Sequence, residues 1–485
     1  MTAVFNHSRV GFDLIDLSVH LDRAIDSRAP SICRFCMPKR QRIRDPLHDL
    51  IEFDGSDFES LMWEALNASE FQRLRRVKQL GFCELVYPGA SHTRFAHSVG
   101  VFHTARQLSS VVKNQVDKFD QDRAHVAMAA ALLHDLGHGP FSHAFEDALK
   151  SLDKNKPKKH KRHELWTSEI VDGDTEVGDV LRRGGKEFRA EVAKLLISEV
   201  PTDIYAAIVS SQFDADRLDY VRRDRMMTGA QHGGFDYPWL LANLEVDRIP
   251  FSIDDDHIGE AESLILGEKA FQAAESYVLG LFHMYFAVYF HKATRSAEKL
   301  LSAIIRRIGE LCDSGEVDKS GLTDSHPIVK FIRSRSLADY LALDDFVIWA
   351  SLGLLAVGKD EVCSELSSRL LNRRLYKAID IGNKFAGRED ARVRFKGKLQ
   401  EAISKGEFGP VDVFEDQPNR TPYKLRGYET PEAMSKIHIR KPDGKYEDLA
   451  NRSDVVKALQ AKSMYRVYAR TDEVALKIQK LAEGL

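Results

Sequence analysis

Apolar residues recur at steps of three and four along most of this chain, which is the spacing of one face of an α-helix. Residues 71–80 place an apolar side chain at every third position, and Gly81 follows as a stop signal. The same pattern predicts helices over residues 97–116, 123–136, 188–198, 203–211, 216–224 and 270–305. Short β-like pieces occur near the C-terminal end, at residues 437–439 and 465–468. The pattern therefore predicts a mainly α-helical bundle with a mixed α/β C-terminal region.

Interruptions of this pattern divide the chain into three parts. The first forty residues hold an amphipathic stretch and then a breaker region from Pro30 to Pro38. The core begins near an Asp45-Pro46 turn, and a loop at residues 312–326 resembles a boundary. We therefore expect an N-terminal extension (1–40), a helical core (41–310) and a C-terminal region (327–485).

Composition narrows the class of protein. The 485 residues are 43% hydrophobic and 29% charged, and the formal charge is −3, so nothing drives the whole chain toward nucleic acid or an anionic membrane. No apolar stretch approaches the roughly 18–20 residues that span a bilayer, and the N-terminus lacks the apolar segment of a signal peptide. We expect a cytoplasmic protein without a membrane contact; binding to nucleic acid stays open.

The cysteines and one lysine-rich run carry information that the overall composition does not. The five cysteines are widely spread, so we expect no disulfide framework. Cys33 and Cys36 form a single CxxC pair, which is half of a zinc or redox motif, and we expect them to be reduced thiols. The lysine-rich run 153–163 predicts an exposed loop. That loop is either a solvated connection or part of the entrance for an anionic substrate.

The most distinctive residues of the chain are His134 and Asp135, at the end of an apolar helix. With His97 upstream and Asp216 downstream, they supply two imidazoles and two carboxylates. This donor set suits a divalent ion that activates water, such as iron, manganese or zinc. A helical bundle brings such groups together in its core, and four protein ligands leave coordination positions for water and a phosphate oxygen.

Acid–base residues follow directly. His143 and Glu146 lie three apart at a predicted helix start, so they share a face, and the carboxylate makes His143 a candidate proton donor. His138 and His163 are further candidates. A lone His-Asp pair is common by chance, and a buried histidine is more often a core residue than a ligand. The density of such residues between His134 and Glu146 favours chemistry over packing.

Several stretches in this order resemble the HD-domain superfamily of metal-dependent phosphohydrolases. They are similar above all to the deoxynucleoside triphosphate triphosphohydrolase (dNTPase) branch, whose mammalian members join a sterile-alpha-motif domain to an HD domain. No sterile-alpha-motif domain is evident here. The resemblance covers roughly residues 43–300 and rests on residues 45–48, 71–81, 87–98, 134–143, 214–220 and 289–292.

The resemblance implies a role for each matching residue. It gives metal ligands at His97, His134, Asp135 and Asp216, and acid–base or active-site roles to His143, Glu146, His138 and His163. It gives substrate contacts to Gln79, Leu80, Arg94, Arg217, Tyr220 and Tyr289. Of these, Gln79 and Leu80 would contact the deoxyribose, Arg94 and Arg217 a phosphate, Tyr220 the sugar and Tyr289 the base. Arg217 stands where the family often has lysine, so its phosphate contact would differ in geometry.

The implied reaction is hydrolysis at the α-phosphorus of a deoxynucleoside triphosphate, which gives a deoxynucleoside and triphosphate. The ion itself (Fe, Mn, Zn, Ni or Mg) is not distinguished. The resemblance also implies a homo-oligomer, dimer or tetramer, assembled through the C-terminal region. Allosteric activation by a nucleotide stays open, since Gln41 and Asn67 depart from the regulatory pattern while Gln72 and Arg75 keep it.

Two alternatives remain. An HD-type phosphodiesterase or nucleotidase would act on a monophosphate, a cyclic nucleotide or single-stranded nucleic acid. A binding or assembly protein would use the metal only structurally. The substrate-contact residues favour the dNTPase over the first alternative, and the spare histidines speak against the second.

Overall fold

The computed structural model describes residues 40–153, 161–198, 201–253, 256–420, 423, 436–459, 462–483 and 485. The N-terminal extension, with its CxxC pair, and residues 154–160 of the basic run lie outside the described residues. Residues 40–485 form one compact unit. The division of this unit into a core that ends at residue 310 and a region that begins at residue 327 stays a prediction.

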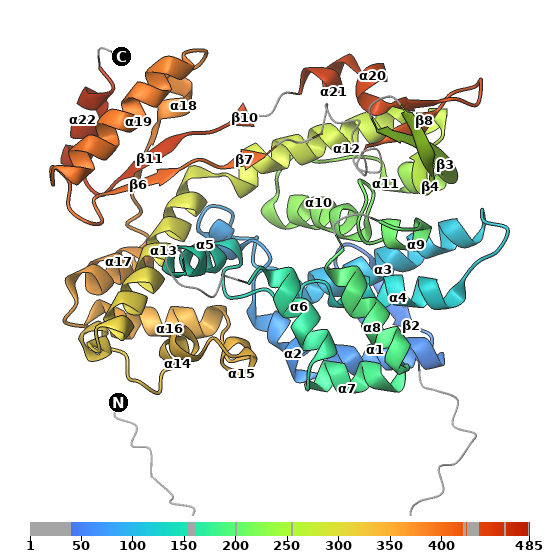
Figure 1. Cartoon of the computed structure of the whole chain (residues 1–485), viewed down its shortest axis with the longest axis horizontal. Helices are drawn as coiled ribbons and strands as arrows, with labels where there is room; N and C mark the ends of the chain where they lie inside the picture. The colour runs from blue at the N-terminus through green and yellow to red at the C-terminus, as the bar shows by residue number, and fades with distance from the viewer. Residues whose placement is uncertain are drawn as a thin grey trace, which may run out of the picture. The chain divides into compact units, whose positions relative to one another are not determined.

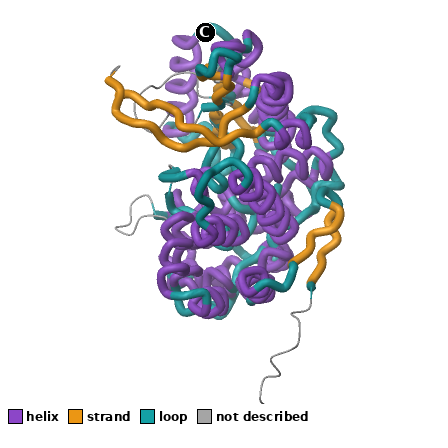
Figure 2. Tube along the Cα trace, turned by 90° about the vertical axis from the view of Figure 1, so that its right-hand side faces the viewer, coloured by secondary structure: helices purple, strands orange, loops and turns teal. Residues whose placement is uncertain are grey.

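Helices dominate the chain, as predicted (Figures 1 and 2). In the first half they are α1 (Asp57–Asn67), α2 (Ser69–Arg73), η1 (Leu74–Arg76), η2 (Gly81–Leu85), α3 (Arg94–Lys113), α4 (Gln121–Leu133), α5 (His143–Leu152), α6 (His163–Asp172), α7 (Glu176–Arg183), α8 (Lys186–Leu196), α9 (Ile204–Ala207), α10 (Ala215–Thr228) and α11 (Tyr237–Ala242). In the second half they are η3 (Glu268–Ala270), α12 (Phe271–Met284), η4 (Tyr285–Tyr289), α13 (Lys292–Asp313), η5 (Val317–Ser320), α14 (Pro327–Ser334), α15 (Leu337–Leu341), α16 (Asp345–Ala356), α17 (Glu361–Leu371), α18 (Ile381–Lys384), α19 (Glu389–Ser404), α20 (Leu449–Arg452), α21 (Asp454–Ala458) and α22 (Asp472–Leu481).

The strands form small sheets. Antiparallel β1 (Gln41–Asp45) and β2 (Asp49–Phe53) are joined by the predicted Asp-Pro turn, in which Asp45 Oδ1 accepts from His48 N at 3.0 Å. The remaining strands are β3 (Leu244–Ile253), β4 (Asp256–Leu266), β5 (Lys377–Asp380), β6 (Val413–Asp416), β7 (Asn419–Arg420), β8 (His438–Arg440), β9 (Tyr446–Asp448), β10 (Lys462–Ser463) and β11 (Arg466–Ala469). They pair in the orders β3-β4-β8-β9, β5-β11-β6 and β10-β7. The predicted β-like pieces near residues 437 and 465 are thus confirmed as β8 and β11.

Three predicted helices differ from the structure. The one predicted over 203–211 extends only over α9, because residues 208–213 form turns and bends. The other two are interrupted near the functional site. The helix predicted over 71–80 ends at Arg76, because Val77 is extended and Lys78 forms a β-bridge with Thr93. The helix predicted over 270–305 is interrupted after Met284 by the π-helical turn η4, where Phe290 N donates to Tyr285 O at 2.8 Å. His291 is then extended and caps α13 through its Nδ1. Both breaks face the functional site described below.

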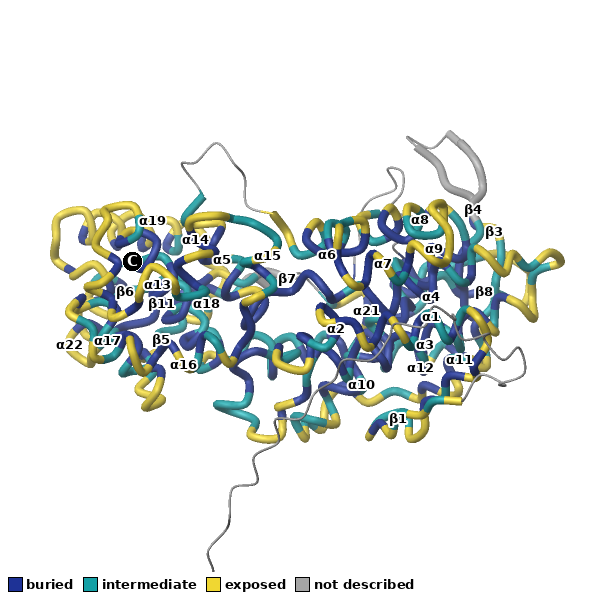
Figure 3. Tube along the Cα trace, turned by 90° about the horizontal axis from the view of Figure 1, so that it is seen from below, coloured by how far each residue is buried: buried dark blue, intermediate teal, exposed yellow. Residues whose placement is uncertain are grey.

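The hydrophobic interior forms two main clusters. The first packs α3 and α4 against α1, α10 and α12, and Figure 3 shows these helices rich in buried residues. The second joins Phe82, Phe141 and Phe145 to residues of α13, α14, α16 and α17. Residues on both sides of the 312–326 loop therefore share one core.

Among the helices that the structure describes, none combines the length and the apolar character that a bilayer crossing requires.

Candidate metal centre and active site

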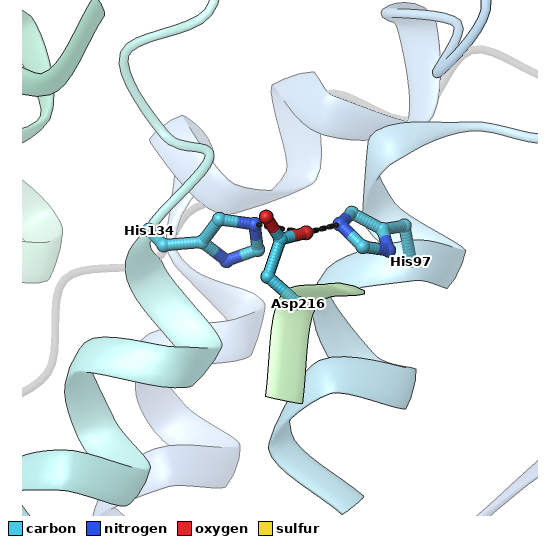
Figure 4. Close-up of side chains that lie close together, drawn as sticks. All are labelled: His97, His134 and Asp216. Carbon is cyan, nitrogen blue, oxygen red and sulfur yellow. Dashed lines mark hydrogen bonds and ion pairs between the residues drawn. The ribbon is translucent and has the colours of Figure 1, made fainter. Parts of the chain in front are cut away.

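Three side chains from three helices meet at one point (Figure 4). His97 comes from the first turn of α3, His134 from the C-terminal end of α4, and Asp216 from the first turn of α10. Asp216 Oδ1 lies 2.9 Å from His97 Nε2 and 3.6 Å from His134 Nε2, so the carboxylate stands between the two imidazoles. Helix packing has brought together residues 119 positions apart.

Asp135, the fourth predicted ligand, lies beside these three residues. Its Oδ1 lies 3.3 Å from His134 Nε2, and its Oδ2 lies 3.9 Å from His97 Nε2. Arg94 Nη1 donates to the same Oδ2 at 2.6 Å. The structure thus brings together all four predicted ligands, and it adds a buried cation that compensates their negative charge.

Hydrogen bonds to neighbouring groups orient both imidazoles. His134 Nδ1 faces the carbonyl oxygen of Ala131 at 2.9 Å, and His97 Nδ1 faces Asp219 Oδ2 at 2.9 Å. When each Nδ1 carries the proton, each Nε2 keeps its lone pair and points into the cluster. A carbonyl or carboxylate behind a histidine is the usual support for a metal ligand.

Charge and burial shape the protonation of this cluster. Burial alone would lower the pKa of His97, but Asp216 and Asp219 outweigh burial and raise that pKa to about 10. Burial alone would raise the pKa of Asp135, but the Arg94 guanidinium and the adjacent imidazoles hold it well below its usual value. Both aspartates of the cluster are therefore carboxylates, since His134 and His97 likewise lower the pKa of Asp216.

The ligand set fits a divalent ion. His134 Nε2 is buried and has no hydrogen-bond partner among the described residues. An orphaned, buried ring nitrogen is costly in a folded protein unless something else satisfies it. A bound cation would take the place of the proton on each Nε2, and two imidazoles with two carboxylates suit the harder first-row ions without distinguishing among them.

The predicted acid–base residues form a second group. His143 Nδ1 and Glu146 Oε2 are 3.2 Å apart on α5, and His163 Nδ1 lies 2.8 Å from Glu146 Oε1. The hydrogen bond that His143 donates to the Glu146 carboxylate raises the pKa of His143, while 69% of the His143 side chain stays exposed. The Glu146 carboxylate therefore favours the protonated form of His143, and the imidazole is accessible to a ligand.

His138 lies between the two groups. Its Nε2 is 3.2 Å from Asp135 Oδ1, and its ring stacks on His163 with a centroid separation of 3.9 Å. Burial, together with Arg94 and His163, holds the pKa of His138 well below its usual value. Its imidazole is therefore neutral, and its pKa is shifted in the opposite direction from that of His143.

A pocket of about 520 Å³ opens over both groups. Twelve of the fourteen predicted site residues line it, and the other two, His97 and Glu146, lie directly behind it. The twelve are Gln79, Leu80, Arg94, His134, Asp135, His138, His143, His163, Asp216, Arg217, Tyr220 and Tyr289. Residues from six segments of the sequence thus share one cavity.

The substrate-contact residues are not equally available. Arg94 is already held by Asp135 and by Ser142 Oγ, which accepts from Arg94 Nη2 at 2.6 Å. Arg217 donates to Asp214 at 2.8 Å, and Gln79 Oε1 is buried without a partner among the described residues. Gln79 therefore has unused hydrogen-bonding capacity in the pocket.

Sequence reasoning missed several residues of this site. Asp219 orients the ligand His97, Ser142 holds Arg94, and Asp224, Arg295 and Glu298 line the pocket. Asp219 stands within the quoted 214–220 stretch, so its proximity to Asp216 was a usable signal. Arg295 and Glu298 had none, because only folding brings α13 to this cavity.

Comparisons with known proteins agree with this geometry. The HD domain family matches residues 94–221, and the HD associated region matches residues 258–480. The uncharacterized protein YwfO of Bacillus subtilis is 32% identical over 420 residues, which cover 86% of this chain and 89% of that protein. The deoxynucleoside triphosphate triphosphohydrolase SAMHD1 of Danio rerio is 31% identical over 225 residues, which cover 41% of this chain and 35% of that enzyme.

A solved structure extends the likeness to nearly the whole fold. The crystal structure of a phosphohydrolase from Bacteroides thetaiotaomicron has a TM-score of 0.67 and 25% identity, and the match covers 89% of this chain and 99% of that one. The chain belongs to the HD-domain family and carries the HD-associated region. It is an HD-domain, metal-dependent phosphohydrolase.

Proposed function

We propose that this protein hydrolyses deoxynucleoside triphosphates to deoxynucleosides and inorganic triphosphate. The observation that carries the proposal is that one cavity is lined by three of the four candidate ligands (His134, Asp135 and Asp216), by His143 and by the two tyrosines, while His97 and Glu146 contact these residues from behind. Its volume, about 520 Å³, lies within the usual range for small-ligand sites. The partial likeness to the Danio rerio dNTPase supports the same substrate class.

In this proposal, separate residues hold the metal ion, donate a proton and bind a phosphate oxygen. A divalent ion at His97, His134, Asp135 and Asp216 would supply an activated water and polarise the phosphate. His143, whose pKa is raised by Glu146, donates a proton to the departing 5′-oxygen. Arg217 stays charged, because Asp214 raises its pKa further, and it binds a phosphate oxygen.

The aromatic wall supports recognition of the nucleoside. The rings of Tyr220 and Tyr289 meet edge to face with a centroid separation of 6.3 Å, and Tyr289 donates its hydroxyl to Asp224 at 2.8 Å. A sugar packed against the ring face of Tyr220 would place its 2′-carbon on an apolar surface. A hydroxyl buried without a partner is penalised, which favours deoxyribose over ribose.

The product identifies the reaction. Purified protein with Mn²⁺ and each dNTP should release triphosphate, measured by ion chromatography. Monophosphate with pyrophosphate, or no turnover with any dNTP mixture, contradicts the proposal. Turnover of cyclic nucleotides or single-stranded DNA in its place would support the phosphodiesterase alternative.

Variants tie this activity to the cluster. His134→Ala and Asp135→Ala should each abolish turnover while circular dichroism stays helical. His232→Ala is the matched control, since this exposed histidine stacks on His283 outside the pocket. Activity that survives either ligand substitution contradicts the assignment of the metal centre.

We propose further that the protein works as a homo-oligomer and that a nucleotide regulates its assembly. Gln72 and Arg75 support this, since Arg75 Nε donates to Gln72 Oε1 at 2.8 Å and its guanidinium lies 3.5 Å from the Phe95 ring centroid. The pair is thus preorganised at the surface. Light scattering with and without dNTP should show a ligand-linked change of mass; an unchanged mass contradicts regulation by assembly.

A further inference from the structure

Part of the HD-associated region lies against the loop that carries the acid–base residues. This loop, residues 137–143, connects the metal ligands to α5. Tyr340 donates its hydroxyl to Gly137 O at 2.7 Å, and the ring of Trp349 contacts that of Phe141 with a centroid separation of 6.0 Å. Residues 340–349 therefore form one side of the support for the 137–143 loop.

Asp345 makes the central contact of this support. Its Oδ1 accepts from Phe141 N at 2.8 Å, and its Oδ2 accepts from Lys78 N at 2.9 Å. The carboxylate is 2% exposed and joins two segments that lie 204 and 267 residues away in the sequence. Lys78 precedes Gln79 and Leu80, so one side chain ties both the acid–base loop and the predicted sugar-contact segment.

These two bonds are not part of the helix that Asp345 begins. Asp344 caps α16, with its Oδ1 accepting from Val347 N at 3.0 Å. The Asp345 carboxylate instead accepts from two backbone groups outside its helix. Burial raises the pKa of Asp345 to about 6, against the opposing effect of the two backbone donors. A buried carboxylate in this position is not explained by the stability of α16.

The backbone that Asp345 holds is strained. Phe141 has φ 51° and Ser142 has φ 50°, a region that residues other than glycine rarely adopt. Such conformations persist only where the surrounding structure fixes them. Ser142 Oγ accepts from Arg94, and His143 follows immediately. Loss of the restraint at Phe141 would therefore displace both Ser142 and His143.

We propose that Asp345 is a positioning residue for the active site. It fixes the 137–143 loop against residues 78–80, and thereby sets where His143 meets the substrate. Its kinetic consequence rests on the proposed function; its structural consequence does not. Misplacement of a catalytic group by about 1 Å lowers turnover by roughly 100-fold.

The test compares Asp345→Asn and Asp345→Ala with Asp360→Asn. Asp360 is also a buried aspartate of this region, and it caps α17 by accepting from Cys363 N at 2.9 Å without contacting the pocket. Hydrogen exchange by mass spectrometry reports directly on the amides of Lys78 and Phe141. Asparagine keeps one acceptor oxygen, so it provides a variant that folds if alanine does not.

Peptides that contain residues 78–80 and 137–143 should exchange about tenfold faster in Asp345→Asn, and faster still in Asp345→Ala. kcat should fall about tenfold or more, with a smaller change in KM, while Asp360→Asn changes neither. If wild-type protein hydrolyses no dNTP but the exchange changes as expected, the positioning role stands and the proposed function fails. Unchanged exchange in both peptides, or the same kinetic loss in Asp360→Asn, overturns the positioning role.

Discussion

The orientation of His97 depends on Asp219, and this dependence can be measured. The Asp219 carboxylate is fully buried and faces His97 Nδ1 at 2.9 Å and His48 Nε2 at 2.6 Å. It also accepts from Arg223 Nε at 2.7 Å, while Arg223 Nη1 donates to Asp45 at 2.8 Å. Asp219→Asn removes the charge that holds Nδ1 protonated and leaves the other groups in place.

The magnitude follows from the role of such supporting groups. Loss of the carboxylate behind a metal-bound histidine lowers metal affinity by about 10–100-fold. Since each tenfold change is about 1.4 kcal/mol, the expected loss is about 1.4–2.8 kcal/mol. Unfolding free energy should fall by about 1.5–3 kcal/mol, the usual value of a hydrogen bond to a charged group, because Arg223 keeps Asp45 as its partner.

Isothermal titration with Mn²⁺ measures the affinity, and chemical denaturation measures the stability. Asp416→Asn is the matched control: this aspartate is 2% exposed and holds Arg295 of the pocket with both carboxylate oxygens, far from His97 in the sequence. It should lose stability and keep its affinity for Mn²⁺. Wild-type affinity in Asp219→Asn, or an equal loss of affinity in the control, would refute the reasoning.

Three further outcomes are expected. Glu146→Gln removes the carboxylate that raises the pKa of His143, so the alkaline limb of the kcat–pH profile should move to lower pH; an unmoved limb contradicts the role of His143 as acid. Tyr289→Phe leaves Asp224 without its hydroxyl donor and should lower kcat/KM for dNTPs about tenfold, and unchanged kinetics would remove Tyr289 from recognition. Leu133→Ala should lower the unfolding free energy by about 2–5 kcal/mol in urea denaturation, since Leu133 is fully buried; a change below 1 kcal/mol would mean that the α4 core repacks freely.

Sequence patterns predicted the helices whose apolar faces pack on one another, such as α3 and α4. These patterns gave a wrong helix boundary where a contact with a distant segment favours a backbone conformation other than the one that the apolar spacing predicts. Residues 71–80 do repeat apolar side chains at a helical step, but the β-bridge at Lys78 and the bond to Asp345 favour extended backbone there. Neither partner is close in sequence, so no local pattern could have indicated the break.

Distance along the chain also decides which residues of the site could be predicted from the sequence. The ligands His134 and Asp135 are adjacent, and further histidines and a glutamate follow within about ten residues, so the density of such side chains in one short stretch predicts a reactive site. Asp345 could not be predicted, because its role depends on two backbone donors more than 200 residues away in the sequence. Sequence predicts chemistry where reactive groups cluster along the chain, and it misses groups that only support them.

The shared hydrophobic cluster has a consequence for attempts to dissect this enzyme. Phe141 lies in the 137–143 loop, with Phe82 in η2 and Phe145 in α5 beside it, yet this cluster also contains residues of α13, α14, α16 and α17. A fragment truncated near residue 310 would expose these aromatic rings to water and lose the anchor of the loop. The HD domain of this chain is thus not an independent folding unit, and we expect a chimera that contains it to need residues 327–376 as well.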